Sequence, residues 1–101
     1  MIPVKRIEIV VEDAHTTEVL DLLRKAGVPG YTVVRDVQGM GDRGNRMGDV
    51  LAGVFRNCYI LVAWPDGDVE ALVETLHPLL TRYGGLCLVS DAALIKHRPD
   101  A

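Results

Sequence analysis

The sequence predicts an α+β fold: a ferredoxin-like split βαβ sandwich with the order βαββαβ, in which a four-stranded antiparallel sheet carries two helices on one face. Three observations predict it. The chain has 101 residues, which is the length of one domain. Its hydrophobic pattern gives two strand–helix–strand units in succession, and a glycine-rich stretch separates them. We therefore expect residues 1–101 to form a single domain with a long loop between the second and third strands.

The first unit covers residues 4–37. Residues 4–11 are rich in β-branched side chains that alternate with charged ones, which predicts a strand. Apolar residues then recur at helical spacing up to residue 26, and Gly27 ends this helix. Residues 31–37, rich in valine, predict the second strand. Three residues can cap the start of the helix: Asp13, Thr16 or Thr17.

The second unit begins with residues 56–64, a strand that is apolar on both faces. Pro65 and Asp66 then open a helix. Residues 86–90 predict the fourth strand, and residues 92–96 predict a short fifth one. Two glycines stop the helix: Gly84 and Gly85. We expect the tail, about residues 97–101, to be mobile.

The third strand has a consequence for assembly. Helices cover only one face of such a sheet, yet both faces of this strand are apolar. A monomer would leave a hydrophobic sheet face in water. The sequence therefore predicts that another copy of the chain covers the open face.

Composition excludes several function classes. Lys plus Arg is 11 and Asp plus Glu is 14, so the net charge of −3 argues against a nucleic-acid partner. The longest apolar stretch, residues 58–64, is far shorter than the roughly 20 residues of a spanning helix, so we expect no membrane insertion. The N-terminus lacks the order of a secretion signal, and two cysteines then suggest reduced thiols in the cytoplasm.

The long loop contains a glycine motif. Residues 38–53 hold five of the ten glycines, and Gly39-Met40-Gly41-Asp42-Arg43-Gly44 matches G-x-G-x-x-G. A dinucleotide fingerprint should open a helix, and the residues that follow form a poor one. Two interpretations stay open. Either the glycines let backbone N–H groups approach an anion that Arg43 and Arg46 also bind, or this is a flexible surface loop with incidental arginines.

Catalytic and metal sites find little support. Neither His15 nor His97 has a nucleophile or paired carboxylate at a useful spacing, so both are expected at the surface and the protein is not expected to be an enzyme. Cys58, Cys87 and His77 lack metal-ligand spacing. The two cysteines should lie two strand spacings apart, about 9–10 Å, which is too far for a disulfide.

Several motifs, in their order along the chain, resemble the PII signal-transduction superfamily. They are GYTVV at residues 30–34, Gly39-x-Gly41-x-Arg43-x-x-Arg46 in the loop, and YGG at residues 83–85. The resemblance runs from Lys5 to about Lys96 and is greatest to the PII-like branch associated with inorganic-carbon (bicarbonate) uptake. It implies a homotrimer that binds adenine nucleotides in the clefts between subunits. It also implies that the long loop (the T-loop, about residues 38–55) contacts a membrane transporter or an enzyme.

The resemblance also implies site residues. The adenine would lie by Thr32 and Val62, and the phosphates by the loop residues and by the glycine pair of the facing subunit. Basic residues near the C-terminus would add phosphate contacts. The full ligand-binding set is Thr32, Gly39, Met40, Gly41, Arg43, Arg46, Val62, Gly84, Gly85, Lys96 and Arg98.

Departures from the family pattern narrow the choice of ligand. Asp42-Arg43 replaces the Arg-Gln pair of nitrogen-type proteins, which argues against Mg-ATP and 2-oxoglutarate. The glycine pair lacks the lysine that grips a terminal phosphate, so AMP or ADP is favoured over ATP, with bicarbonate as an additional small anion near the arginines. No tyrosine lies in residues 38–53, which excludes uridylylation there. The spacing from Thr32 to Gly39 is one residue longer than usual, which predicts a bulge.

The function that follows is that of a non-enzymatic sensor, in which nucleotide binding orders the T-loop. The alternative is a metal- or small-ligand-binding ferredoxin-fold trimer of the CutA type. That protein would use Cys58, Cys87 or His77.

Overall fold

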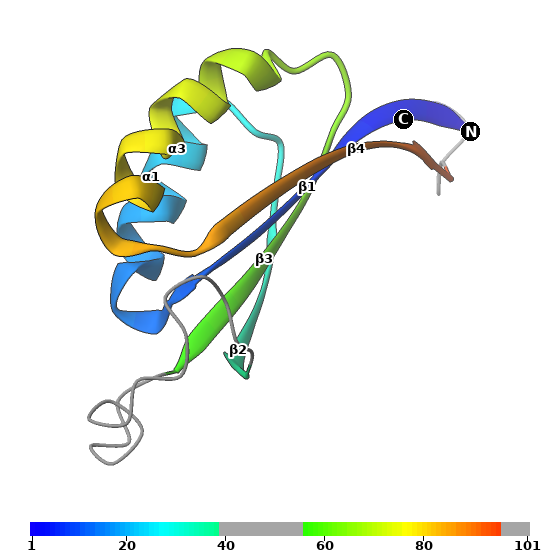
Figure 1. Cartoon of the computed structure of the whole chain (residues 1–101). Helices are drawn as coiled ribbons and strands as arrows, with labels where there is room; N and C mark the ends of the chain where they lie inside the picture. The colour runs from blue at the N-terminus through cyan, green and yellow to red at the C-terminus, as the bar shows by residue number, and fades with distance from the viewer. Residues whose placement is uncertain (39–55, 96–101) are drawn as a thin grey trace.

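The computed structural model describes residues 1–38 and 56–95. Within them, one antiparallel sheet carries two helices on one face (Figure 1). This confirms the predicted ferredoxin-like sandwich. The elements, in chain order, are β1 (Ile2–Glu12), the 3-10 turn η1 (Asp13–His15), α1 (Thr16–Ala26), β2 (Thr32–Val37), β3 (Asn57–Trp64), α3 (Val69–Tyr83) and β4 (Leu86–Leu94). The T-loop from residue 39 to 55 and the tail from residue 96 onward lie outside the described residues.

The order of strands across the sheet is β2-β3-β1-β4, so the two strands of each unit are not neighbours. β1 pairs with β3 from Lys5↔Trp64 to Glu12↔Asn57. It also pairs with β4 along its other edge, as far as Ile2↔Leu94. β1 and β3 are therefore the two interior strands, and β2 and β4 form the edges.

The fourth strand differs from the prediction. A fifth strand over residues 92–96 is wrong, because β4 continues without a break to Leu94. Ala92 and Ala93 pair with β1 in the same register as the residues before them. The prediction left Asp91 between the two strands, but Asp91 forms an ion pair with Lys5 of β1, and the neighbouring Ser90 accepts a hydrogen bond from Arg6.

The helix starts also differ. None of the three expected caps serves α1, whose N-cap is His15, without a side-chain hydrogen bond. Thr16 is instead buried, and its Oγ1 lies 2.9 Å from Sγ of Cys58 on β3. Its hydroxyl therefore ties the first turn of α1 to the sheet. α3 begins at Val69 rather than at Pro65-Asp66, because the carboxylate of Asp68 accepts from the Ala71 N–H at 3.1 Å and caps the helix there.

The core lies between the sheet and the helices. Alternate residues of β1 and β3 face the helices, and leucines and a valine of α1 and α3 pack on them. Each of the main members is almost completely shielded from solvent. The buried cluster is Ile7, Ile9, Val11, Cys58, Ile60, Val62, Trp64, Val19, Leu23, Leu72, Leu76 and Leu79.

The opposite sheet face, here called the open face, carries no helix (Figure 1). By strand alternation it presents Val34, Tyr59, Leu61, Leu86 and Leu88. Val34 is 51% exposed, Leu86 45% and Leu88 58%. The described subunit thus leaves a contiguous apolar surface uncovered, as the sequence of β3 predicted. Among the described residues, neither helix is long and apolar enough to cross a membrane.

The turn from α3 into β4 generates a prediction about stability. Gly85 has φ +108°, and a Cβ there would lie 2.4 Å from the carbonyl oxygen of Val10. Gly85→Ala should therefore cost about 2–3 kcal/mol of unfolding free energy, through backbone strain and the forced separation of β1 and β4. Urea unfolding at a fixed chain concentration measures it.

Gly30→Ala is the matched control, because a Cβ there meets nothing within 4 Å and its φ is not in the left-handed region. It should leave stability unchanged or raise it by less than about 1 kcal/mol. Equal stabilities for the two variants would contradict the strain assigned to Gly85.

Candidate functional site

The candidate site lies at one end of the sheet, where β2 ends and β3 begins. These two ends are the described stems of the T-loop. The pairing of the two strands changes there: Val34 faces Tyr59, whereas Val37 faces Asn57. Three steps along β2 thus match two along β3, so one extra residue is accommodated. This confirms the bulge predicted from the spacing.

The bulge has a definite backbone conformation. Asp36 has φ +59°, which is unusual for a residue with a side chain. Its carboxylate lies 3.6 Å from Nη1 of Arg56, the residue just before β3. The bulge therefore turns an acidic side chain of one stem toward a basic side chain of the other.

A second set of contacts joins the stems to the turn η1. Arg35 Nη1 donates to the carboxylate of Asp13, and the Asp13 N–H donates to the carbonyl of Arg56 at 2.6 Å. The side chains of both ion pairs are at least 40% exposed. Each pair is therefore worth less than about 1 kcal/mol, and an anionic ligand can compete for these guanidinium groups.

The stems also form a hollow. It has a volume of about 290 Å³ and is lined by Asp36, Val37, Gln38 and Arg56. Sequence analysis did not single out Asp36, Gln38 or Arg56. The signal that could have found them was the predicted bulge, since an extra residue opposite the start of β3 must displace its neighbours from the regular ladder.

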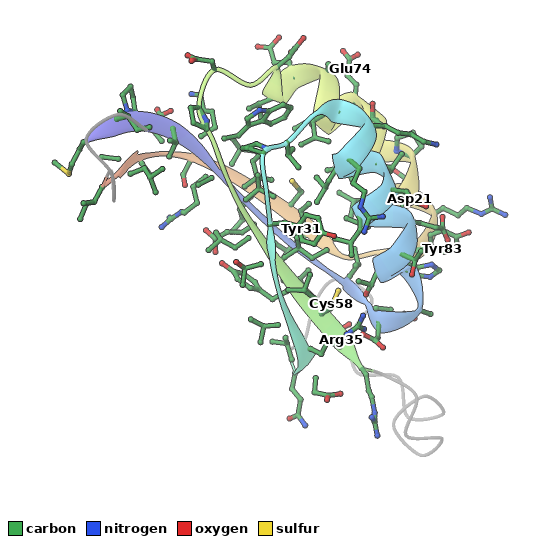
Figure 2. All side chains as sticks on the ribbon, turned by 180° about the vertical axis from the view of Figure 1, so that it is seen from behind. Asp21, Tyr31, Arg35, Cys58, Glu74 and Tyr83 are labelled. Carbon is green, nitrogen blue, oxygen red and sulfur yellow. The ribbon has the colours of Figure 1, made fainter. Side chains whose placement is uncertain are left out.

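The two residues assigned to the adenine lie on opposite faces of the sheet. Thr32 pairs with Leu61 on the open face and is exposed. Val62 is fully buried under the helices, so no part of this residue is exposed on the described subunit. Tyr31, next to Thr32, is held by α1, because its hydroxyl accepts from Nη2 of Arg24 at 2.9 Å (Figure 2). This hydrogen bond raises the pKa of the Arg24 guanidinium.

The glycine pair ends α3, as the sequence predicted. Gly84 has φ +84°, and its N–H donates to the carbonyl of Leu80 at 2.8 Å. The preceding residue, Tyr83, lies beside the start of α1, where its ring stacks on His15 with 3.8 Å between centroids (Figure 2). Sequence analysis placed His15 at the surface, but it is partly buried, and the stack ties the end of α3 to η1.

The glycine pair and the β2 stem of the loop lie at the same end of the sheet but at opposite edges. β2 and β4 are the edge strands, and two strands separate them. Strands lie about 4.8 Å apart, so about 14 Å separates the edges. Within the described residues, one subunit therefore keeps its glycine pair apart from the end of β2.

The remaining ligand residues of the sequence prediction lie outside the described part of the chain. They stay predictions. These residues are Gly39, Met40, Gly41, Arg43, Arg46, Lys96 and Arg98.

The cysteines occupy the places expected of them. Cys58 lies on β3 between the sheet and α1, and Cys87 lies on β4, so β1 separates them (Figure 2). Both are free thiols. Burial raises the pKa of the Cys87 thiol, which makes it a poor thiolate donor at neutral pH. Within residues 1–38 and 56–95, no three ligating side chains gather into a metal site.

Comparison with known proteins now places the fold. A family model described as nitrogen regulatory protein P-II matches residues 4–99. No match is found among the curated proteins. Among solved structures, the chain is similar to CPII, a nitrogen regulatory PII-like protein from Thiomonas intermedia K12 bound to ADP, AMP and bicarbonate. The TM-score is 0.78 and the identity 32%, over 93% of this chain and 94% of that one.

Two further structures agree. CPII bound to ADP, AMP and acetate has a TM-score of 0.80 and 31% identity, over 94% of this chain and 91% of that one. The GlnK–ATP complex from B. subtilis has a TM-score of 0.66 and 21% identity, over 90% and 84%, and it supports the fold alone. The resemblance found in the sequence is thus confirmed. The chain belongs to the P-II family of nitrogen regulatory proteins, in the PII-like branch that CPII represents.

Proposed function

We propose that this protein is a non-enzymatic PII-like regulator that binds ADP or AMP in clefts between the subunits of a homotrimer. One observation carries the proposal. CPII, whose structure holds ADP, AMP and bicarbonate, is 32% identical to this chain over 94% of its own length. The aligned region includes nearly all of both chains, so the open face, the loop stems and the glycine pair all lie within it.

The geometry of the subunit supports a site between copies. The β2 stem of the loop and the glycine pair lie at opposite edges of the sheet, about 14 Å apart. A neighbouring copy packed on the open face can present its Gly84-Gly85 turn to the stems and to exposed Thr32 of the first copy. The nucleotide would then bridge the two subunits, and assembly would be needed for binding.

The phosphate end of the site would be supplied by the T-loop. Arg43 and Arg46 are placed by sequence to contact phosphate oxygens, which guanidinium groups can bind with two parallel hydrogen bonds. Bicarbonate, a small planar anion, suits the same groups. The glycine pair lacks a neighbouring lysine, so ADP and AMP should bind more tightly than ATP.

Nucleotide binding would change the T-loop only through a difference in affinity between its states. Phosphate contacts made by Arg43 and Arg46 in one loop conformation supply that difference. We propose that this conformation regulates a transporter or enzyme of inorganic-carbon metabolism, in the cytoplasm. The CutA-type alternative has no supporting cluster in the described residues.

The nucleotide proposal makes a direct prediction for calorimetry. The wild-type protein should bind ADP and AMP, and Arg46→Ala should weaken both by about ten- to hundredfold, because a charge-assisted hydrogen bond is lost. Lys25→Ala removes one positive charge from the exposed end of α1 and should change neither affinity. Absence of heat from any adenine nucleotide at millimolar concentration refutes the proposal.

The trimer proposal is tested by mass. Light scattering should give three times the chain mass of 11.1 kDa for the wild type. Leu88→Glu, on the open face, should give monomers, because a carboxylate would be buried in an apolar interface. Val73→Glu is the matched control: Val73 is a 39% exposed residue on α3, and its replacement should leave the mass unchanged.

A further inference from the structure

A polar network crosses the open face. Tyr59 on β3 donates its hydroxyl to Oε2 of Glu8 on β1 at 2.8 Å. The other oxygen of the same carboxylate lies 3.2 Å from Nε of Arg6. Arg6 Nε in turn lies 3.1 Å from Oγ of Ser90 on β4. The network thus spans three adjacent strands of the sheet.

The surroundings of this network are apolar. Glu8 pairs with Leu61 on one side and with Leu88 on the other. Two residues away from Leu61 along β3, Tyr59 pairs with Val10 of β1 on one side and with Val34 of β2 on the other. The Glu8 side chain is only 24% exposed even in the isolated subunit. A carboxylate therefore sits near the middle of the apolar surface that remains to be covered.

Placing a charge there is costly for association with an apolar partner. Any surface that covers Glu8 removes its remaining water, and a carboxylate with unfilled acceptor positions is strongly disfavoured in an apolar interface. The hydroxyl of Tyr59 and the guanidinium of Arg6 fill part of this need. The hydrogen bond to Glu8 also raises the pKa of Tyr59, so the phenol keeps its proton to a higher pH than an ordinary tyrosine. Burial of Glu8 in an interface therefore costs less than burial of a carboxylate without these partners.

The charges of this surface are self-complementary. Arg6 and Glu8 stand two residues apart on the same face of β1, so positive and negative groups alternate over a short distance. The chain as a whole is acidic, with a net charge of −3, whereas this pair is neutral. A second copy of the chain offers the same alternation and can match each charge with its opposite. A purely apolar partner cannot do this.

We propose that the Arg6–Glu8–Tyr59 network selects identical copies of this chain as partners on the open face and fixes one arrangement of them. The inference rests on the trimer of the proposed function and adds the residues that specify it. The apolar residues drive association, and the network makes any arrangement that buries Glu8 and Arg6 without filling their remaining hydrogen-bond positions unfavourable. A single polar position can set register and subunit number in this way in other assemblies.

The test compares three interface variants by sedimentation over a wide range of chain concentration, with circular dichroism to confirm folding. Glu8→Ala leaves Arg6 unmatched at the interface and should raise the concentration of half-dissociation by at least about tenfold. Tyr59→Phe should raise it by a smaller factor, because it removes one hydrogen bond and keeps the ring. The double variant Arg6→Leu with Glu8→Leu should still associate, but into more than one size, because the selective element is gone.

Lys5→Ala is the matched control. It removes an ion pair with Asp91 between the same two strands, but alternation places Lys5 on the other face of the sheet. It should leave the assembly unchanged. Wild-type-like trimers from Glu8→Ala, or a single uniform trimer from the double variant, would overturn the network proposal alone. A monomeric wild type would instead refute the trimer of the proposed function, so the two failures are distinguishable.

Discussion

The constraint on which this structure depends is that two helices can cover only one face of a four-stranded sheet. β1 and β3 supply large apolar side chains to the helix-covered face, and nearly all of these are completely buried. The same strands, with β2 and β4, also place valine, leucine and tyrosine on the face without helices. Burying that exposed apolar surface by association is favourable. In the proposed trimer, assembly would therefore contribute to stability, and a ligand site between subunits would follow from the same packing.

Periodicity was sufficient to predict most of the fold. Strands and helices followed from alternating and helical spacing, and the helix-stopping glycines marked the end of α3 correctly. What failed were details set by tertiary contacts. Thr16 looks like a cap in the sequence, but its hydroxyl is used by Cys58 in the core. The predicted break between the strands at Asp91 does not occur, because side chains of β1 hold Ser90 and Asp91 within a continuous strand.

The site could be predicted only where the family motif has a local signature. The bulge in β2 was predicted because the spacing from Thr32 to Gly39 is one residue longer than is usual in the family that the sequence resembles. Arg56 was missed, since its importance comes from lying across from Asp36 and not from any neighbour in the sequence. The stack of His15 on Tyr83 was missed for the same reason, because most of the chain separates the two residues and only the folded structure brings their rings together.

The ion pairs at the loop stems suit a switch because they are weak. Arg35 with Asp13 and Arg56 with Asp36 are exposed, so each contributes less than about 1 kcal/mol. When a ligand anion binds one of these guanidinium groups, little free energy is lost with the broken ion pair. The bulge that carries Asp36 also has an uncommon backbone conformation. The glycine pair differs, because the Val10 carbonyl of β1 lies directly behind Gly85, where a Cβ would come within 2.4 Å of its oxygen. A nucleotide between the two would thus meet one rigid wall and one adjustable wall, which allows binding to change the loop while the sheet and its assembly stay fixed.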